Sequence, residues 1–344
     1  MTFLAFFGII ALMKLTYKEV FTGLFNIASL FAICIVFSLI VIKSKPILIK
    51  NPVKQPTSTP VVTTPVKTNT PSNSRTQNNP LFAKNPSWSE DFSGSTPEAL
   101  SSKSWNILEG PAQNSNRELQ YYTSSESNLR AENGILKIIA THQPQPEGYN
   151  YASARLETEG KKEFLYGRID VSAKLPKGTG TWPAIWLLPA NNIYADKSPE
   201  DYLLRYKNGG EIDIMEAVGY KPNQIYGVAH TASDIKKRSD GTGSNSSVIV
   251  PDSADKFNKY SLLWTPDKLI YEVNDKPFFS YSKPANSDYM TWPYDQPFFL
   301  IINLAMGGVW GGMDRSKFPE NGIDNSALPA SFEIDSIDYY PYIQ

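Results

Sequence analysis

The chain has 344 residues, with 33 basic and 34 acidic side chains and a formal net charge of −1 at pH 7. This balance gives no electrostatic reason to expect a nucleic acid as a partner. With one cysteine, two histidines and no His-Glu-x-x-His motif, the sequence excludes a disulfide framework and disfavours a zinc hydrolase.

The N-terminal region contains an uncharged apolar run, residues 20–42, that is long enough to span a bilayer as a helix. We expect a single-pass transmembrane signal-anchor, because Lys43 and Pro46 follow it where a cleavage site would need small residues. Residues 1–19 would be cytoplasmic, or partly an upstream artefact if translation begins at Met13. The alternative is a secreted protein whose signal peptide is cleaved.

Residues 43–86 are rich in proline, threonine, serine and asparagine. Such a segment cannot bury enough apolar surface to offset its chain entropy, so we expect a disordered linker. At about 5–6 Å times the square root of its length, the linker would reach about 35 Å. The remaining residues, 87–344, are sufficient for one folded domain with a sizeable core.

Short strands separated by turn residues dominate the sequence after the linker. Segments 134–140, 164–171, 268–273 and 298–303 are typical of β-strands. The pair Asn274-Asp275 is typical of a hairpin turn. Amphipathic helical periodicity is nearly absent, so the sequence predicts an all-β domain, either a sandwich or a jelly roll.

One strand is unusually acidic. In segment 209–216, Gly-Gly-Glu-Ile-Asp-Ile-Met-Glu, acids alternate with apolar residues, which predicts a strand with one face in a core and the other in a polar cleft. Glu211 and Asp213 share a face, whereas regular pairing would turn Glu216 away. We predict a β-bulge near Ile214-Met215 that returns Glu216 to the acidic face. Crowded carboxylates are typical of glycoside hydrolysis, although a solvated acidic strand is the alternative.

Several motifs occur in order around this strand. They are Arg117-Glu118-Leu119-Gln120-Tyr121-Tyr122-Thr123, Ser153-Ala154-Arg155-Leu156, Tyr166-Gly167-Arg168-Ile169, Ala173-Lys174-Leu175-Pro176, Trp182-Pro183-Ala184-Ile185-Trp186-Leu187-Leu188-Pro189, Trp264-Thr265-Pro266-Asp267, Trp292-Pro293-Tyr294-Asp295-Gln296-Pro297-Phe298 and Asn303-Leu304-Ala305-Met306-Gly307-Gly308. With them, the region from about Trp88 to the C-terminus resembles the laminarinase branch of glycoside hydrolase family 16. The resemblance implies a concanavalin A-like β-jelly-roll sandwich. It also implies a retaining, endo-acting hydrolase of internal β-1,3-glucosidic bonds in laminarin-like β-glucans.

The resemblance assigns roles to the three acids. Glu211 would be the nucleophile and Glu216 the acid/base, with a pKa raised so that it can protonate the leaving oxygen. Asp213 would orient Glu211 and share part of the proton load. A retaining mechanism needs the two glutamate carboxyl groups about 5–5.5 Å apart.

Aromatic and imidazole side chains are expected to bind the sugar. Trp182, Trp186 and Trp310 would stack on pyranose faces, although Trp186 could equally be a core residue. His230 matches a position that lines the family's cleft, and a satisfied core histidine is the alternative. Three other tryptophans are expected in the core, namely Trp105, Trp264 and Trp292.

Asn116, Arg155 and Gln296 are the polar subsite residues that the resemblance implies, while Arg155 could equally serve as a structural ion-pair residue. The first motif departs from the family's usual Asn-Asn-Glu because Arg117 stands at its second position. The loop at 307–312 lacks the asparagine and proline often found around its tryptophan. Both departures affect substrate subsites and leave the chemistry unchanged.

No cofactor is expected for catalysis. The resemblance implies a structural Ca²⁺ held by oxygen ligands at Asp91, Gly134 and Asp335 on the convex face, while a solvated Asp335 is the alternative.

The sequence leaves three other functions open. They are transglycosylation, hydrolysis of another β-glycan such as mixed-linkage glucan, agarose or carrageenan, and non-catalytic binding of β-glucan. The presence of both glutamates argues against the last. We expect a monomer anchored in the cell membrane. Its catalytic domain would be extracellular, because glucan polymers lie outside cells.

Overall fold

The computed structural model describes residues 81–94, 100, 103–112, 116–197, 209–237, 243–313, 317–318 and 321–343. All of them belong to the second of two units into which the chain divides, Arg75–Gln344. The expected N-terminal segment, transmembrane span and most of the linker lie outside the described residues. Within the described ranges, no helix combines the length and apolar character needed to cross a bilayer.

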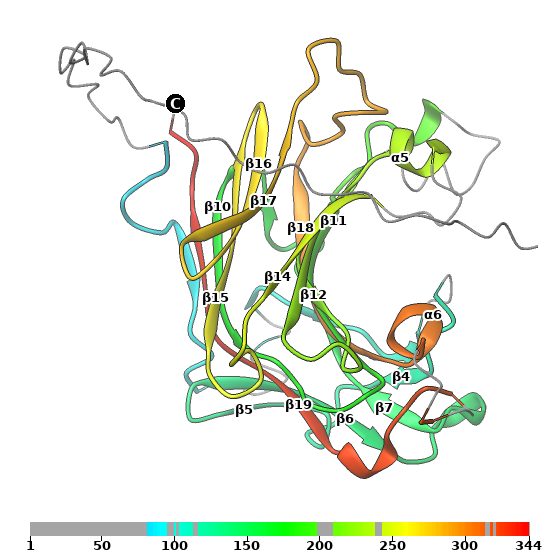
Figure 1. Cartoon of the computed structure of the whole chain (residues 1–344). Helices are drawn as coiled ribbons and strands as arrows, with labels where there is room; N and C mark the ends of the chain where they lie inside the picture. The colour runs from blue at the N-terminus through cyan, green and yellow to red at the C-terminus, as the bar shows by residue number, and fades with distance from the viewer. Residues whose placement is uncertain are drawn as a thin grey trace, which may run out of the picture. The chain divides into compact units, whose positions relative to one another are not determined.

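Two antiparallel-rich sheets pack face to face as a β-sandwich (Figure 1). The first contains 11 strands, β1 (Trp88–Glu90), β3 (Gly110–Pro111), β4 (Gln120–Tyr122), β5 (Leu129–Glu132), β6 (Ile135–His142), β7 (Tyr151–Ser153), β10 (Gly167–Lys174), β15 (Asn258–Thr265), β16 (Lys268–Val273), β17 (Lys276–Ser282) and β19 (Ala330–Tyr340). The second contains 8 strands, β2 (Asn106–Ile107), β8 (Arg155–Glu157), β9 (Glu163–Phe164), β11 (Thr181–Pro189), β12 (Glu211–Ala217), β13 (Gln224–His230), β14 (Ser244–Ile249) and β18 (Phe298–Met306).

Helical structure among the described residues is limited to short segments. They are η1 (Pro146–Gly148), η2 (Ala195–Lys197), α5 (Ala232–Lys237), α6 (Gly308–Gly311) and η3 (Asn325–Ala327). In Figure 1, α6 lies on the side of the β11–β12 sheet that faces away from β15. The predicted all-β sandwich is therefore confirmed.

The main core lies between the sheets and follows from strand alternation. In β10 every second residue is buried, so one face of that strand enters the core. Strand β18 is buried along its whole length because it is central in its sheet and covered on both faces. The tryptophans expected in the core are 0–1% exposed, namely Trp105, Trp264 and Trp292.

The predicted hairpin turn is present between β16 and β17. Asn274 and Asp275 have φ angles of 51° and 61°, and positive φ at both central residues is the mark of a type I′ turn.

The predicted strand at 164–171 is wrong, because two strands occupy it. Tyr166 and Gly167 adopt positive φ angles of 56° and 114°, which breaks the extended chain. Phe164 then pairs with β18 in one sheet, while Gly167 begins β10 in the other. Hydrophobic alternation alone did not reveal this crossing between sheets.

The folded region begins before residue 87. Phe82 pairs with Tyr342, and their rings meet edge to face at 6.2 Å. The polar composition of residues 43–86 gives no indication that Phe82 pairs with Tyr342.

Candidate active site

The acidic strand is β12, and two glycines fix its entry. Gly210 has a φ of +79°, and a Cβ atom there would lie 2.5 Å from Pro293 Cγ. Only glycine combines that backbone conformation with so close an approach. The carbonyl of Gly209 accepts a hydrogen bond of 3.1 Å from Nε2 of Gln296. The start of β12 is thus held against the segment that precedes β18.

The predicted β-bulge is present in the middle of β12. Asp213 pairs with Val228 and Glu216 pairs with Tyr226, so two residues of β12 oppose one residue of β13. The register between β11 and β12 shifts at the same point. Ile214 and Met215, the two residues of the bulge, are 1% and 0% exposed and belong to the main core.

The bulge places the three acids on one face of the sheet. Glu211 pairs with His230, and the other two acids pair with the residues two and four positions earlier in β13. Residues two apart on a strand share a face, and paired residues share it too. Glu211, Asp213 and Glu216 therefore lie on one side, opposite the core.

His230 lies between the first two acids. Its Nε2 atom is 2.9 Å from Oδ2 of Asp213 and 3.8 Å from Oε1 of Glu211. Asp213 is 2% exposed, so the imidazole supplies a partner for a nearly buried carboxyl group. The backbone around His230 is fixed, because the Tyr294 hydroxyl donates to its carbonyl over 2.7 Å.

A second tyrosine supports the same strand from the core. The Tyr271 hydroxyl donates to the carbonyl of Val228 over 2.9 Å. Burial raises the pKa of Tyr271 well above its ordinary value of 10, and the negative charge of Asp213 adds to the shift. Tyr271 therefore stays protonated and keeps this hydrogen bond.

Aromatic rings surround Glu216. The indole Nε1 of Trp182 donates to Oε1 of Glu216 over 2.9 Å. Trp310 in α6 meets Trp182 edge to face at 5.3 Å, and Tyr226 meets Trp310 at 5.1 Å. Trp182 and Trp310 belong to a small cluster with Val218 that is separate from the main core. These rings therefore form an aromatic wall beside Glu216.

A second aromatic and polar group lies farther along β11. The indole of Trp186 donates to Oδ1 of Asn303 over 2.8 Å, and the Arg155 guanidinium lies 5.1 Å from the Trp186 ring centroid. Arg155 also pairs with Glu157 at 3.1 Å. Arg155 thus combines a structural ion pair with a place beside a half-buried tryptophan, and Trp186 lies outside the main core.

The comparisons with known proteins agree with this geometry. The family described as glycosyl hydrolases family 16 matches residues 114–324. The chain belongs to this family. It is 37% identical to the β-glucanase of Rhodothermus marinus over 75% of this chain and 85% of that protein.

Solved structures of laminarinases show the same fold. The laminarinase from Rhodothermus marinus matches with a TM-score of 0.67 and 35% identity, covering 77% of this chain and 100% of that one. The laminarinase from Flavobacterium sp. UMI-01 matches with a TM-score of 0.62 and 34% identity, covering 74% and 100% of the two chains. The chain is therefore an O-glycosyl hydrolase of family 16 with the jelly-roll sandwich.

Two expected polar subsite residues differ in their placement. Asn116 lies beside the aromatic wall, because its carbonyl accepts from Val309 N, next to Trp310, over 2.8 Å. Gln296 is 2% exposed, and its amide nitrogen donates to the carbonyls of Gly209 and Pro293. Its side-chain oxygen accepts from another backbone N–H. The expected subsite role of Gln296 is therefore corrected to a structural one.

Sequence reasoning missed several residues of this face. Tyr226 and His230 are four positions apart in β13, and period-2 alternation from His230 would have found Tyr226. Asn303 is the lone polar residue of an otherwise apolar strand, which is itself a signal. Lys221 donates to the Tyr226 hydroxyl over 3.2 Å, and this hydrogen bond raises the pKa of Lys221. No sequence pattern marks that pair.

Two residues of the expected calcium site, Asp91 and Gly134, lie close together. The register of β19 brings Asp335 to the same region, because Ile334 pairs with Leu136 and Ile337 pairs with Glu90. Asp335 is exposed and forms a bulge in β19, because Ser336 and Ile334 pair with consecutive residues of β10. Gly134 has a φ of +75°, and a Cβ atom there would lie 3.6 Å from the Asp91 carbonyl oxygen. Carboxylate and carbonyl oxygens suit a hard cation, so these residues fit Ca²⁺.

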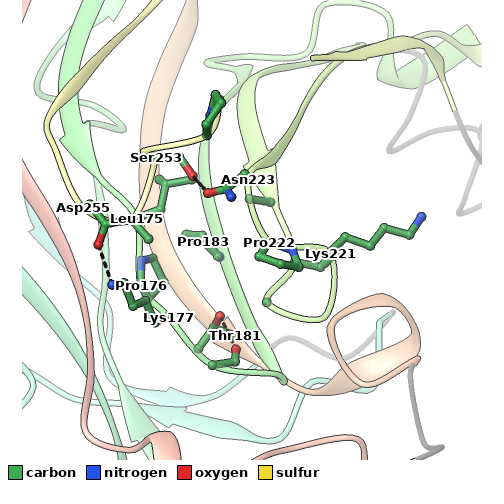
Figure 2. A pocket seen from close by; sticks show the side chains of 16 residues that line it. Leu175, Pro176, Lys177, Thr181, Pro183, Lys221, Pro222, Asn223, Ser253 and Asp255 are labelled. Carbon is green, nitrogen blue, oxygen red and sulfur yellow. Dashed lines mark hydrogen bonds and ion pairs between the residues drawn. The ribbon is translucent and has the colours of Figure 1, made fainter. Parts of the chain in front are cut away.

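A cavity of about 310 Å³ opens on the reverse side of the acidic strand (Figure 2). Thr181 and Ala217 line it, whereas their neighbours Trp182 and Glu216 point to the opposite face of the sheet. Prolines are frequent among the described residues that line this cavity, and no residue of that lining is aromatic. It therefore lacks the ring platforms that a sugar site would use and is separate from the acids.

Proposed function

We propose that this protein is a retaining endo-β-1,3-glucanase that hydrolyses internal bonds of laminarin-like β-glucans. The observation that carries the proposal is the bulge in β12, because it brings Glu216 to the same face as Glu211 and Asp213. Membership of family 16 gives the reaction class. The laminarinase names of similar solved structures support the β-1,3 linkage.

Glu211 is the proposed nucleophile. Its carboxylate attacks the anomeric carbon, the bond to the leaving oxygen breaks, and a covalent glycosyl-enzyme forms. Support comes from its neighbours, because Asp213 and His230 have atoms within 4.8 Å of the Glu211 carboxylate. These two residues would orient the nucleophile without being transformed themselves.

Glu216 is the proposed acid/base. It gives its proton to the leaving oxygen in the first step, and in the second it takes a proton from the water that attacks the anomeric carbon. The Trp182 N–H supports this role, because it binds one carboxyl oxygen over 2.9 Å and so orients the carboxyl group. The enzyme returns to its starting state after both steps.

The extent of the proposed binding face supports endo action. The residues discussed above come from β8, β18, β11, β12 and β13, which are consecutive neighbours in one sheet. At about 4.8 Å per strand spacing, this row extends for about 19 Å. Such a face accommodates several sugar rings, with Trp186 on one side of the acids and the Trp182–Trp310 wall beside Glu216.

The experiment that tests the function is product analysis on three polymers. Purified protein is incubated with laminarin, lichenan and agarose, and the products are separated by chromatography. We expect a ladder of oligosaccharides from laminarin and the same polymer left intact by the Glu211→Gln variant. Three outcomes would contradict an endo-β-1,3-glucanase. They are cleavage of agarose alone, release of monosaccharide as the sole early product, and formation of chains longer than those supplied.

We further propose that residues 20–42 anchor the protein as a monomer in the cell membrane, with 1–19 inside. The linker that starts at residue 43 would hold the catalytic domain outside. Support comes from the uncharged apolar run and the proline-rich composition after it. Membrane fractions washed with alkaline carbonate should retain the protein, and protease added to intact cells should release an active domain. Release by carbonate would overturn the anchor.

We also propose a structural Ca²⁺ at Asp91, Gly134 and Asp335. The bulge at Asp335 and the nearby Asp91 carbonyl support it. Chelation should lower the melting temperature while leaving initial rates at low temperature unchanged, and Asp335→Asn should abolish that shift. An identical response of both proteins to the chelator would count against this site.

A further inference from the structure

Glu211, Asp213 and His230 each present one ligand atom, and these atoms all lie within 4.8 Å of one another. Nε2 of His230 is 2.9 Å from the Asp213 carboxylate and 3.8 Å from that of Glu211. A tetrahedral ion with bonds of about 2.0–2.1 Å holds its ligands about 3.3 Å apart. The two observed distances bracket that value, so small side-chain rotations would place the three atoms around one ion.

The donor set and its environment favour a borderline transition metal. Imidazole nitrogen and carboxylate oxygen are both ligands that Zn²⁺ takes in proteins, whereas a hard cation such as Ca²⁺ prefers six to eight oxygen ligands. Asp213 is nearly buried, and a cation would compensate two neighbouring negative charges. The side chains of His230 and Glu211 are 15% and 14% exposed, which leaves a route from the cleft to the ion.

The ligands are already held in place by the fold. Glu211 and His230 are directly paired across β12 and β13. The hydroxyls of Tyr294 and Tyr271 bind the backbone of β13 at His230 and Val228. Little conformational entropy would therefore be lost when an ion binds.

We propose that Glu211, Asp213 and His230 form a reversible binding site for one Zn²⁺ ion, and that the bound ion blocks glucan hydrolysis. Inhibition rests on the proposed function, because a Glu211 carboxylate bound to the ion cannot attack an anomeric carbon. Binding itself does not depend on that function. The ion and a sugar at the cleavage position exclude each other.

The composition of the chain provides a clean control. The sequence contains two histidines and one cysteine, so few other soft ligands exist. His142 lies in β6 of the other sheet and stacks on Tyr151 at a centroid distance of 5.0 Å. His142→Gln removes an imidazole away from the acids, and Cys34→Ser removes the sole thiol.

Calorimetric titration of the full chain with Zn²⁺ tests binding directly. In a Cys34→Ser background we expect one ion per chain, an affinity at least about tenfold weaker in His230→Gln and in Asp213→Asn, and no change in His142→Gln. Thermal melting identifies which variants fold, and either ligand variant is sufficient. Absence of binding at millimolar Zn²⁺, or an equal loss in His142→Gln, would overturn the site.

Inhibition kinetics test the link to catalysis. Zn²⁺ should raise the apparent KM for laminarin without changing kcat, and EDTA should restore the original rate. A fall in kcat at constant KM would show that the ion acts elsewhere and would overturn the proposal. If laminarin is not hydrolysed at all, the proposed function fails, and the calorimetric result alone decides whether the metal site exists.

Discussion

Trp182 and Glu216 are joined by a hydrogen bond of 2.9 Å from the indole Nε1 atom to a carboxyl oxygen. The Trp182 ring also packs edge to face against Trp310 at 5.3 Å. One side chain thus connects the aromatic wall to the proposed proton donor. Because the pair comes from adjacent strands in fixed register, Glu216 has little freedom to rotate away from the substrate.

Trp182→Phe tests this connection because it keeps an aromatic ring and removes the N–H donor. A hydrogen bond to a charged group is worth about 1.5–3 kcal/mol, which corresponds to about a 13- to 160-fold loss in kcat. We expect that loss with little change in KM on laminarin. Trp186→Phe is the matched control, because its N–H goes to Asn303 and its effect should fall mainly on KM. Equal kcat values for Trp182→Phe and the wild type would show that the Trp182 N–H donor does not assist Glu216 in catalysis.

Glu211→Gln and Glu216→Gln test the two proposed roles. Each should lower kcat on laminarin by at least about 10³-fold, because one removes the attacking carboxylate and the other the transferable proton. Melting temperatures should change little, since both side chains lie outside the core. Activity retained by either variant, measured as reducing ends released, would contradict the assignment.

An aryl glucoside with a good leaving group separates the roles. Glu216→Ala should turn over faster when azide is added, because the first step then needs no proton and azide replaces water in the second. With azide, Glu211→Ala should give a glycosyl azide whose anomeric configuration is opposite to that of the azide product from Glu216→Ala. If azide produces the same anomer with both variants, the roles of the two glutamates are not those proposed.

The acidic face was predictable because its causes are local. Alternation in Glu211-Ile212-Asp213 puts Glu211 and Asp213 on one face, and Glu216 can join that face only through a bulge. The β16 strand and the turn at Asn274-Asp275 follow from the same short-range rules. These features depend on neighbours in sequence, so a single chain carries enough information to place them.

The failures are tertiary in origin. Gln296 occurs in a motif that suggests a sugar ligand, yet the fold buries it against the backbone at Gly209. Phe164 and Gly167 look like one strand, and only the pairing of β9 with β18 separates them. Lys221 and Tyr226 interact because the chain turns between β12 and β13. Such contacts depend on which strands become neighbours, and alternation does not report that.

Arg117→Asn should stabilise the protein. Arg117 is exposed and has a φ of 54°, a left-handed conformation that asparagine adopts more readily than arginine. The left-handed conformation costs an L-residue about 1–2 kcal/mol, and asparagine relieves part of that cost. The free energy of unfolding, measured by denaturant titration, should therefore rise by about 0.5–1 kcal/mol. The same change at Arg130, in the extended strand β5, should bring no gain. A decrease for Arg117→Asn would show that its side chain makes a needed contact.

The stability of the Glu157→Gln variant, relative to that of the wild type, should increase as pH rises. Burial raises the pKa of Glu157 above its ordinary value of 4.5, and the nearby Arg155 charge opposes the shift without cancelling it. Below pH 4.5 the carboxyl is protonated in both the folded and the unfolded chain. Above that pH the unfolded chain ionises first, so wild-type stability falls as pH rises through the raised pKa.

Calorimetric melting at pH 4 and pH 7 measures this dependence. The melting temperature of Glu157→Gln minus that of the wild type should be larger at pH 7 than at pH 4. The pH 4 value serves as the internal reference for losses that do not depend on charge. A difference that shrinks with increasing pH would mean that the Arg155 pairing outweighs burial.

The stereochemistry of cleavage tests the central claim most directly, because it depends on Glu211 acting as a nucleophile beside Glu216 on one sheet face. Proton NMR during laminarin hydrolysis records the anomeric signal of the new reducing end before mutarotation. The account predicts that the β-anomer appears first and the α-anomer grows in later. Initial release of the α-anomer would show direct attack by water and would contradict the mechanism.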